Sequence, residues 1–174
     1  MHKRLIIYST TDGQTKLICE KIKNISRFSD KTKIISIYEA ENENLLSYEI
    51  IIIGASIRYG KHNPAVLNFV KENIKTLTEK KSAFFSVNVV ARKSEKNLPE
   101  TNPYMIKFLK LAKWNPNKKA VFAGKIDYPK YGFFDRQIIR LIMFITKGPT
   151  DTSKSYEFTD WSKVSDFVSQ MDQI

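Results

Sequence analysis

The chain has 174 residues, a net charge of +11 and 42% hydrophobic residues. This is enough for one domain with a single core and too apolar for a disordered tail. A single cysteine, Cys19, excludes an internal disulfide and a cysteine-rich zinc site, and two histidines argue against a histidine-based metal centre, so no metal is expected. Without a visible secretory signal or an apolar run of about 20 residues, a reduced, intracellular setting is expected.

Five short apolar runs, rich in β-branched or aromatic residues, are predicted to be strands. They span residues 4–9, 32–38, 49–56, 82–88 and 119–126. Apolar residues at helical spacing predict four helices between and after them. These helices carry Leu17, Ile18, Ile22 and Ile25, then residues 64–77 starting at Pro64, then residues 104–111, and finally residues 161–168. The acidic segment 39–48 is short, and its pattern does not establish a helix.

Strands that alternate with helices predict a three-layer α/β domain in which helices cover both faces of a five-stranded parallel sheet. Right-handed crossovers favour the doubly wound order 2-1-3-4-5, in which ligands bind at the carboxyl ends of the strands near the switch point. We expect residues 1–174 to form one such domain.

Residues 127–152 are too long for a simple connection between the fifth strand and the last helix. Within this insert, residues 133–147 have a helical period of their own. Arg136, Arg140 and Lys147 fall within a sector of about 40°, and apolar residues cover the broad opposite side. The pattern predicts a basic amphipathic helix that packs on the sheet, pairs with a second copy or lies in a membrane interface.

The loop STTDGQT, residues 9–15, joins the first strand to the first helix. One interpretation is a helix start capped by Asp12 or Thr11. The other is a phosphate cradle, in which free N–H groups of the helix start act with the hydroxyls of Thr10, Thr11 and Thr15 and the amide of Gln14. The loop has neither the lysine of an ATP-type P-loop nor the three-glycine dinucleotide fingerprint.

The positive charge is concentrated in one part of the chain. Residues 92–147 carry thirteen Lys or Arg and four Asp or Glu, which accounts for +9 of the +11. Such a bias predicts an anionic partner, which can be a nucleic acid, an anionic lipid or an acidic small molecule.

The loop resembles the phosphate loop of flavodoxin-like FMN proteins, and GASIRYG (54–60) and FFSVNVVARK (84–93) stand where that fold meets the flavin. Together with DGQT, ETNPY and TDW, these segments resemble the quinone-linked protoporphyrinogen oxidases of bacteria, a flavodoxin-like family. The resemblance covers nearly the whole chain. It implies FMN as cofactor, oxidation of protoporphyrinogen IX to protoporphyrin IX in haem synthesis, and electron delivery to menaquinone or ubiquinone.

The resemblance also implies which residues meet FMN. The phosphate is expected at the first loop and the isoalloxazine between the second and third segments, with Tyr59 either stacking on the ring or serving as an ordinary loop aromatic. The carboxylate of Asp12 is expected to face away while its N–H points in. The full set is Thr10, Thr11, Asp12, Gly13, Gln14, Thr15, Ser56, Ile57, Arg58, Tyr59, Gly60, Ser86, Val87 and Asn88.

Cationic side chains are expected to meet the substrate and the membrane. Arg58, Arg92 and Lys93 stand near the expected flavin mouth, where they can pair with the propionates of the porphyrinogen. The insert helix, with Arg136, Arg140 and Lys147, is expected at an anionic membrane surface. The protein would then lie peripherally on the cytoplasmic face of the inner membrane, and assembly into a homo-oligomer is left open. A nucleic-acid module would explain the charge but not the three loop segments.

Two other functions remain open. A flavodoxin-type electron carrier shares the fold, but such carriers tend to be acidic around the flavin. An NAD(P)H:quinone reductase is the other possibility. No residue is assigned as a general base, and His62 beside the second segment is weak evidence for one. Cys19, Trp114 and Trp161 are interpreted as packing residues.

Overall fold

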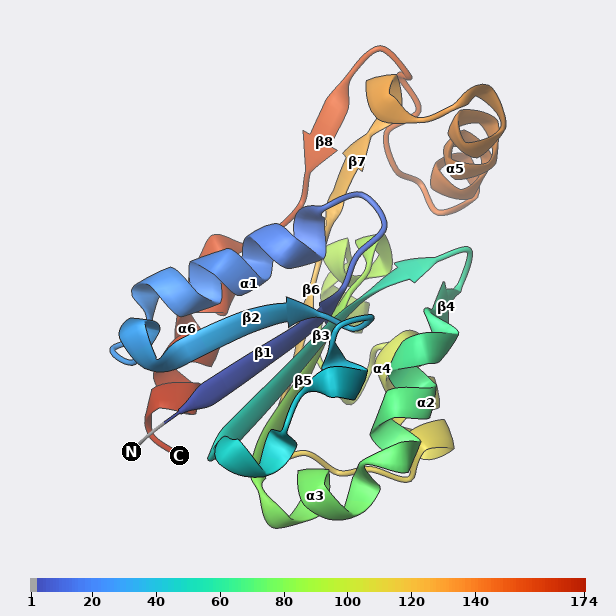
Figure 1. The fold of residues 1–174 in the computed structure, drawn as a ribbon. Coiled ribbons are helices and arrows are strands. Elements are labelled where there is room, and N and C mark those ends of the chain that lie inside the picture. The colour runs from blue at the N-terminus through green and yellow to red at the C-terminus, as the bar shows by residue number, and fades with distance from the viewer. Residues whose placement is uncertain (1–2) are drawn as a thin grey trace.

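The structure, a computed structural model, describes residues 3–174. A central sheet lies between two layers of helices, and a smaller two-stranded sheet with its own helix stands beyond one end of the central sheet (Figure 1). In chain order the strands and α-helices are β1 (Arg4–Ser9), α1 (Gln14–Ile25), β2 (Thr32–Ser36), β3 (Ile50–Arg58), β4 (Lys61–His62), α2 (Pro64–Glu72), α3 (Ile74–Glu79), β5 (Lys81–Val87), α4 (Pro103–Ala112), β6 (Lys118–Phe122), β7 (Lys125–Asp127), α5 (Phe133–Ile145), β8 (Ser155–Glu157) and α6 (Trp161–Asp172).

The five long strands pair in parallel in the order β2-β1-β3-β5-β6, which confirms the predicted topology. The two-residue strand β4 was not predicted; it turns back antiparallel on the end of β3. The register places Gly54 of β3 beside Phe85 of β5. A Cβ on Gly54 would lie 2.1 Å from the Phe85 ring, so only glycine lets the two strands pack here.

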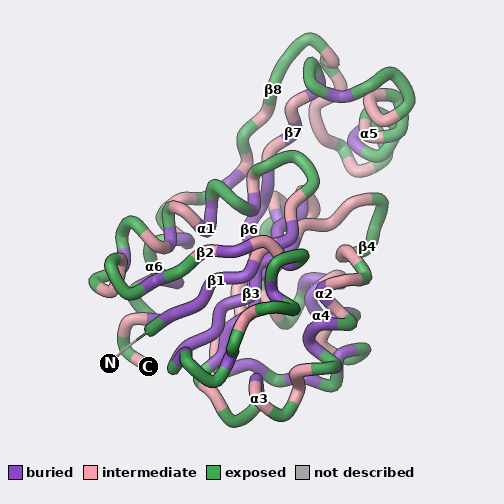
Figure 2. Tube along the Cα trace, viewed as in Figure 1, coloured by how far each residue is buried: buried purple, intermediate pink, exposed green. Residues whose placement is uncertain are grey.

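Two apolar clusters cover the two faces of the sheet. Helices α1 and α6 bury one face around Ile6, Ile52 and Phe85, and α2, α3 and α4 bury the other around Ile53 and Phe84. Figure 2 shows the buried residues concentrated along the strands, while the outer helix surfaces are exposed. Continuously apolar strands are what a sheet covered on both faces requires.

Two helical predictions need correction, and the segment left open between the second and third strands can be assigned. The helix predicted over residues 64–77 is two helices, because Asn73 ends α2 and starts α3. On α1, Ile18, Cys19 and Ile22 face the core, whereas Leu17 and Ile25 are exposed rather than part of the buried face. Residues 39–48 form only two short 3₁₀ turns, Ala40–Asn42 and Leu45–Ser47.

The segment 119–126 was predicted as one strand, and this prediction is also wrong, because the segment forms parts of two strands. The β6 strand ends at Phe122, and β7 leaves the sheet to pair antiparallel with β8. The insert therefore runs from about residue 125 to 157, wider than the predicted 127–152. It has a small core of its own, made of Ile126, Tyr128, Tyr131 and Met143.

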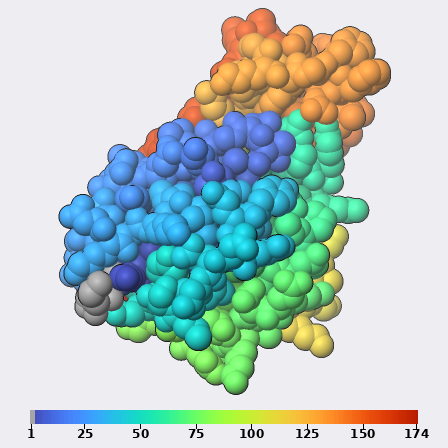
Figure 3. All heavy atoms as spheres, viewed as in Figure 1, coloured from blue at the N-terminus to red at the C-terminus, as the bar shows by residue number. Residues whose placement is uncertain are grey.

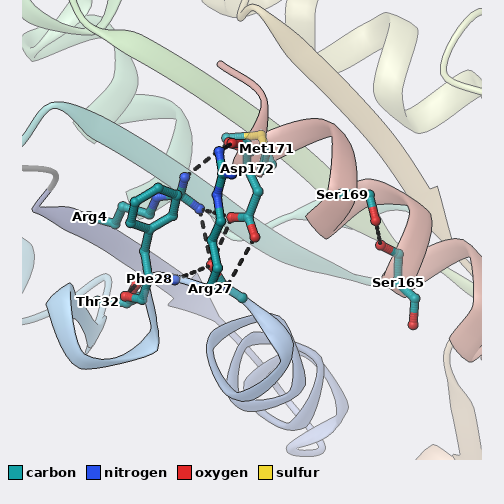
Figure 4. Close-up of polar contacts among 9 residues, drawn as sticks. Arg4, Arg27, Phe28, Thr32, Ser165, Ser169, Met171 and Asp172 are labelled. Carbon is teal, nitrogen blue, oxygen red and sulfur yellow. Dashed lines mark hydrogen bonds and ion pairs between the residues drawn. The ribbon is translucent and has the colours of Figure 1, made fainter.

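A buried ion pair joins the amino end of the sheet to the end of the chain (Figure 4). The Arg4 guanidinium, with its side chain 3% exposed, contacts the Asp172 carboxylate and also donates to the Met171 carbonyl at 3.1 Å. Ser26 donates to the same carboxylate at 2.8 Å. The Phe28 ring lies 4.1 Å from the guanidinium carbon. This network fixes α6 against β1 and the end of α1.

Candidate functional site

The first loop, residues 10–13, leads from β1 into α1 at the carboxyl end of the sheet. Gly13 precedes the helix in the left-handed region, with φ of 90°, and its N–H donates to Thr10 Oγ1 at 3.0 Å. No side chain caps the helix, so the predicted cap by Asp12 or Thr11 is wrong. The first amides of α1 have no acceptor within the helix and face outward as a helix start does.

Thr15 is the most informative residue of this loop. Its side chain is fully buried in the first turn of α1, yet its Oγ1 has no hydrogen-bond partner among residues 3–174. A buried hydroxyl without a partner costs free energy, so such a group is expected to meet a bound acceptor. Thr15 lines the main cleft of the structure, and a phosphate oxygen is the acceptor that this helix start favours.

Gln14 takes a different role from the one predicted. Its Nε2 donates to Glu157 Oε1 at 2.8 Å and to Thr159 Oγ1 at 2.9 Å. The amide group is therefore directed at the last residue of β8 and at Thr159 just after it. Gln14 still lines the cleft, but its N–H groups tie the first loop to β8.

The second loop is the turn between β3 and β4. Tyr59 and Gly60 both have positive φ, 49° and 76°, which makes the turn sharp. A tyrosine in the left-handed region is uncommon, and such strain is often kept at functional positions. The Tyr59 side chain is half exposed, and its hydroxyl donates to Asp135 of α5.

Arg58 joins three segments around the cleft. Its guanidinium donates to Asp12 Oδ2 at 3.0 Å and to Asp135 Oδ2 at 2.7 Å. Partial burial alone would lower the pKa of Arg58, but the two carboxylates raise it overall, so the side chain stays charged. Asp12 is thus neither a helix cap nor free; it forms an ion pair with the next loop.

The third segment follows β5. Val87 and Asn88 line the cleft, but Ser86 is fully buried behind the wall. Its Oγ lies 2.9 Å from His62 Nε2 and accepts from Asn88 Nδ2 at 3.0 Å. Asn88 Oδ1 in turn accepts from Asn102 Nδ2 at 3.1 Å. Ser86 and the Asn88 amide therefore hold the wall in place and do not face the cleft.

The three segments meet around one cleft. Of the fourteen residues predicted to hold a cofactor, all but Gly13 and Ser86 line it. The sequence did not predict the rest of the lining, which includes Val89, Val90, Tyr104, Gly124, Lys125, Ile126, Tyr131, Ile139, Ile142 and Met143. Most of these come from the insert. Figure 3 shows the insert lying over the end of the molecule against the atoms of the β3–β4 turn.

The insert helix α5 is shorter than predicted and differently placed. It ends at Ile145, and Lys147 lies beyond it with φ of 57°. On this helix Met143 is buried and Ile139 is partly buried. The alternative that the whole broad apolar side packs on the sheet is therefore wrong. A second apolar stripe, within a sector of about 60°, points into solvent. It consists of Phe134, Ile138, Leu141 and Ile145, which are 44–80% exposed.

Of the basic residues predicted to meet the substrate or the membrane, Arg58 lines the cleft and the others do not. Arg92 donates to the Thr146 carbonyl at 2.8 Å and to the Val89 carbonyl at 3.0 Å, so it anchors the end of α5 and does not line the cleft. Arg136 donates to the Tyr131 carbonyl at 2.9 Å. Lys93 is partly buried outside the cleft, and Arg140 and Lys147 are exposed.

Residues 3–174 contain no cluster of three or more His, Cys, Asp or Glu side chains that could hold a metal ion. Across the same residues, no helix combines the length and hydrophobicity needed to cross a membrane.

Residues 5–153 match the family model of the flavodoxin domain. The chain belongs to the flavodoxin family. This flavodoxin-family chain is 43% identical over 173 residues to protoporphyrinogen IX dehydrogenase (quinone) of Escherichia coli K12, covering 97% of this chain and 94% of that protein. It is 44% identical over 171 residues to the protein of the same name from Leishmania major, covering 96% and 73%. The predicted resemblance is thereby confirmed.

Solved structures show the same fold. A flavoprotein from Lactobacillus acidophilus in complex with FMN superposes with a TM-score of 0.50 at 16% identity, over 70% of this chain and 93% of that one. The two-electron reduced flavodoxin of Megasphaera elsdenii superposes equally well at 14% identity, over 68% and 84%. These comparisons confirm the predicted α/β architecture.

Proposed function

We propose that this protein oxidises protoporphyrinogen IX to protoporphyrin IX with FMN as cofactor and a respiratory quinone as electron acceptor. The observation that carries the proposal is the 43–44% identity, over nearly the full chain, to two dehydrogenases of that name. It is supported by a cleft that brings together the three segments predicted to contact the flavin. The unpartnered hydroxyl of Thr15 at the start of α1 supports an FMN phosphate there.

When bound, FMN supplies the redox chemistry, accepting two electrons at a time from the porphyrinogen in three cycles and passing them on to the quinone. The protein binds and positions the reactants. Thr10, Thr11 and Thr15 hold the phosphate, and the β3–β4 turn and Val87 flank the ring system. Ile139, Ile142 and Met143 roof the cleft and keep water from the reacting face.

The cleft offers little acid–base chemistry. Among residues 3–174, Asp12 is the only acidic residue in its lining, and it is paired with Arg58. His62 does not line the cleft. Aromatisation of the macrocycle supplies the driving force, so a protein that orients the substrate and lets protons leave to solvent is sufficient.

We infer further that α5 docks on an anionic membrane. The exposed stripe of Phe134, Ile138, Leu141 and Ile145 points away from the body, while Ile139 and Ile142 of the same helix line the cleft. An amphipathic helix of this kind lies in the bilayer interface. A lipophilic quinone then reaches the cleft along one helix. This would place the protein peripherally on the cytoplasmic face of the cell membrane. A second copy of the chain is the alternative cover for the stripe.

The absorbance spectrum of the purified protein, followed by reconstitution with FMN, tests the cofactor. An anaerobic assay with protoporphyrinogen IX and menaquinone tests the reaction. We expect a flavin spectrum, porphyrin formation that depends on both FMN and quinone, and no turnover with NADPH. A colourless protein that FMN cannot reconstitute would refute the proposal. The positive charge of residues 92–147 argues against the electron-carrier alternative.

A further inference from the structure

A second groove adjoins the cleft on the other side of the β3–β4 turn. Its lining residues come from the turn and β4, the start of α2 and one side of α4. These elements lie below the insert in Figure 1. Gly60 and Tyr104 line both the cleft and this groove, so the two are contiguous. The full lining is Gly60, Lys61, His62, Pro64, Leu67, Tyr104, Lys107, Phe108 and Leu111.

The floor of the groove is apolar and uncharged. Leu67, Phe108 and Leu111 supply most of it. His62 packs edge-on against Phe108, with ring centroids 5.0 Å apart. Burial lowers the pKa of His62 to about 4, which keeps this ring neutral near pH 7. The groove therefore suits a flat apolar body.

Among residues 3–174, the charged residues that line it are two exposed lysines, Lys61 of β4 and Lys107 of α4. No acidic residue lines the groove, and neither lysine forms an ion pair among residues 3–174. The other cations near the cleft have protein partners: Arg58 contacts two carboxylates, Arg92 donates to backbone carbonyls, and Lys125 lies 3.9 Å from the Asp127 carboxylate. Unpaired cations beside an apolar floor are complementary to an apolar molecule that carries carboxylates.

We propose that this groove binds the carboxylate-bearing edge of the tetrapyrrole, with Lys61 and Lys107 pairing with its two propionates. The macrocycle would extend over Gly60 and Tyr104 toward the flavin position in the cleft. The inference rests on the proposed function and gives it a substrate subsite. The uncharged prenyl chain of a quinone would use the apolar floor but would leave both lysines without a role.

Binding of protoporphyrin IX to the FMN-loaded protein tests this directly, because the product keeps both propionates. Its dimethyl ester keeps the ring system and loses both charges. We expect the double variant Lys61→Gln/Lys107→Gln to bind the diacid about tenfold more weakly, since exposed ion pairs contribute up to about a factor of five each. It should bind the ester as the wild type does. The control Lys71→Gln/Lys110→Gln changes two exposed lysines outside the groove and should change neither affinity.

Unchanged affinity for the diacid in the Lys61/Lys107 variant, or an equal loss for diacid and ester, would overturn the subsite. So would a Leu67→Arg/Leu111→Arg variant that raises the KM for menaquinone and leaves diacid binding intact, because the groove would then belong to the quinone. These outcomes are separable from failure of the proposed function. That failure would appear as a wild-type holoprotein without porphyrin-forming activity.

Discussion

Arg58 Nη2 lies 2.7 Å from Asp135 Oδ2, and this ion pair joins the turn after β3 to the first turn of α5. The same guanidinium binds Asp12 of the first loop at 3.0 Å. Asp135 also accepts from the Tyr59 hydroxyl. The Asp135 carboxylate thus holds the insert over the cleft through its contacts with the neighbouring residues Arg58 and Tyr59.

Replacing Asp135 by asparagine should loosen α5 without unfolding the sheet. The carboxylate is partly exposed, so the change in the free energy of global unfolding should stay within about 1 kcal/mol. Amide hydrogen exchange in α5 should become faster. Asp151→Asn is the control, because the carboxylate of this exposed acid in the same insert contacts Ser153 and Lys154, which lie outside α5. Equal exchange in α5 of both variants would show that the Arg58 bridge does not hold the helix.

Thr15→Val keeps the shape of the side chain and removes its unpartnered hydroxyl. Affinity for FMN should fall about tenfold, as expected for loss of a hydrogen bond to a charged group. The stability of the apoprotein should not decrease, because no internal hydrogen bond is lost. Quenching of FMN fluorescence measures the affinity, and Thr15→Ser should restore it. Wild-type FMN affinity in the valine variant would remove Thr15 from the phosphate site.

Stability should depend on pH through His62. Burial lowers its folded pKa to about 4, below the ordinary value of 6.5, so the unfolded chain binds the extra proton first. The stabilisation is complete above pH 6.5 and is lost as the pH falls toward 4, by up to about 3 kcal/mol. Urea unfolding of the wild type and of His62→Gln at pH 7 and pH 4.5 measures it. Parallel pH profiles would contradict a neutral, buried His62.

Asp172→Ala should be strongly destabilising, by about 3 kcal/mol, because it leaves the buried Arg4 guanidinium without its carboxylate. Asp166→Ala on the exposed side of the same helix is the matched control and should change stability by less than about 0.5 kcal/mol. Chemical unfolding of the two variants side by side gives the difference. Similar midpoints would mean that the pair contributes no net stability.

Membrane docking depends on the exposed stripe of α5. Phe134→Glu/Leu141→Glu places charges in that stripe, away from the cleft lining, and should abolish binding to vesicles that contain anionic lipid. Gln137→Glu, at another exposed position of α5, controls for added negative charge. FMN binding should be unchanged in both. If the wild type instead sediments as a dimer that the double variant loses, and neither protein binds vesicles, a second copy covers the stripe.

Much of this architecture could be predicted from the sequence, because strand periodicity and loop chemistry are local. The three segments predicted to contact the cofactor lie at the carboxyl ends of parallel strands. Their residues therefore meet at the same end of the sheet, independently of how their side chains pack. What the sequence could not give depends on long-range partners. The sequence predicted that Arg92 pairs with a ligand carboxylate. In the structure Arg92 donates to the Thr146 carbonyl, 54 residues later in the chain. Gln14 is likewise directed to Glu157.

The role of the insert was predicted only in outline. Its helical period showed one apolar side, but periodicity does not say which part of that side packs on the body. The structure divides it, with Ile139 and Ile142 lining the cleft and Phe134 and Leu141 in solvent. The break of the fifth strand after Phe122 also escaped prediction, because β7 remains extended and differs only in its pairing partner.

The most direct test is the reductive half-reaction of the FMN-loaded protein without oxygen. Mixing it with protoporphyrinogen IX should bleach the flavin absorbance and produce protoporphyrin IX, and added menaquinone should restore the flavin band. NADPH should leave the band unchanged. Bleaching by NADPH with no response to protoporphyrinogen IX would contradict the proposed function and identify an NAD(P)H-dependent reductase on the same fold.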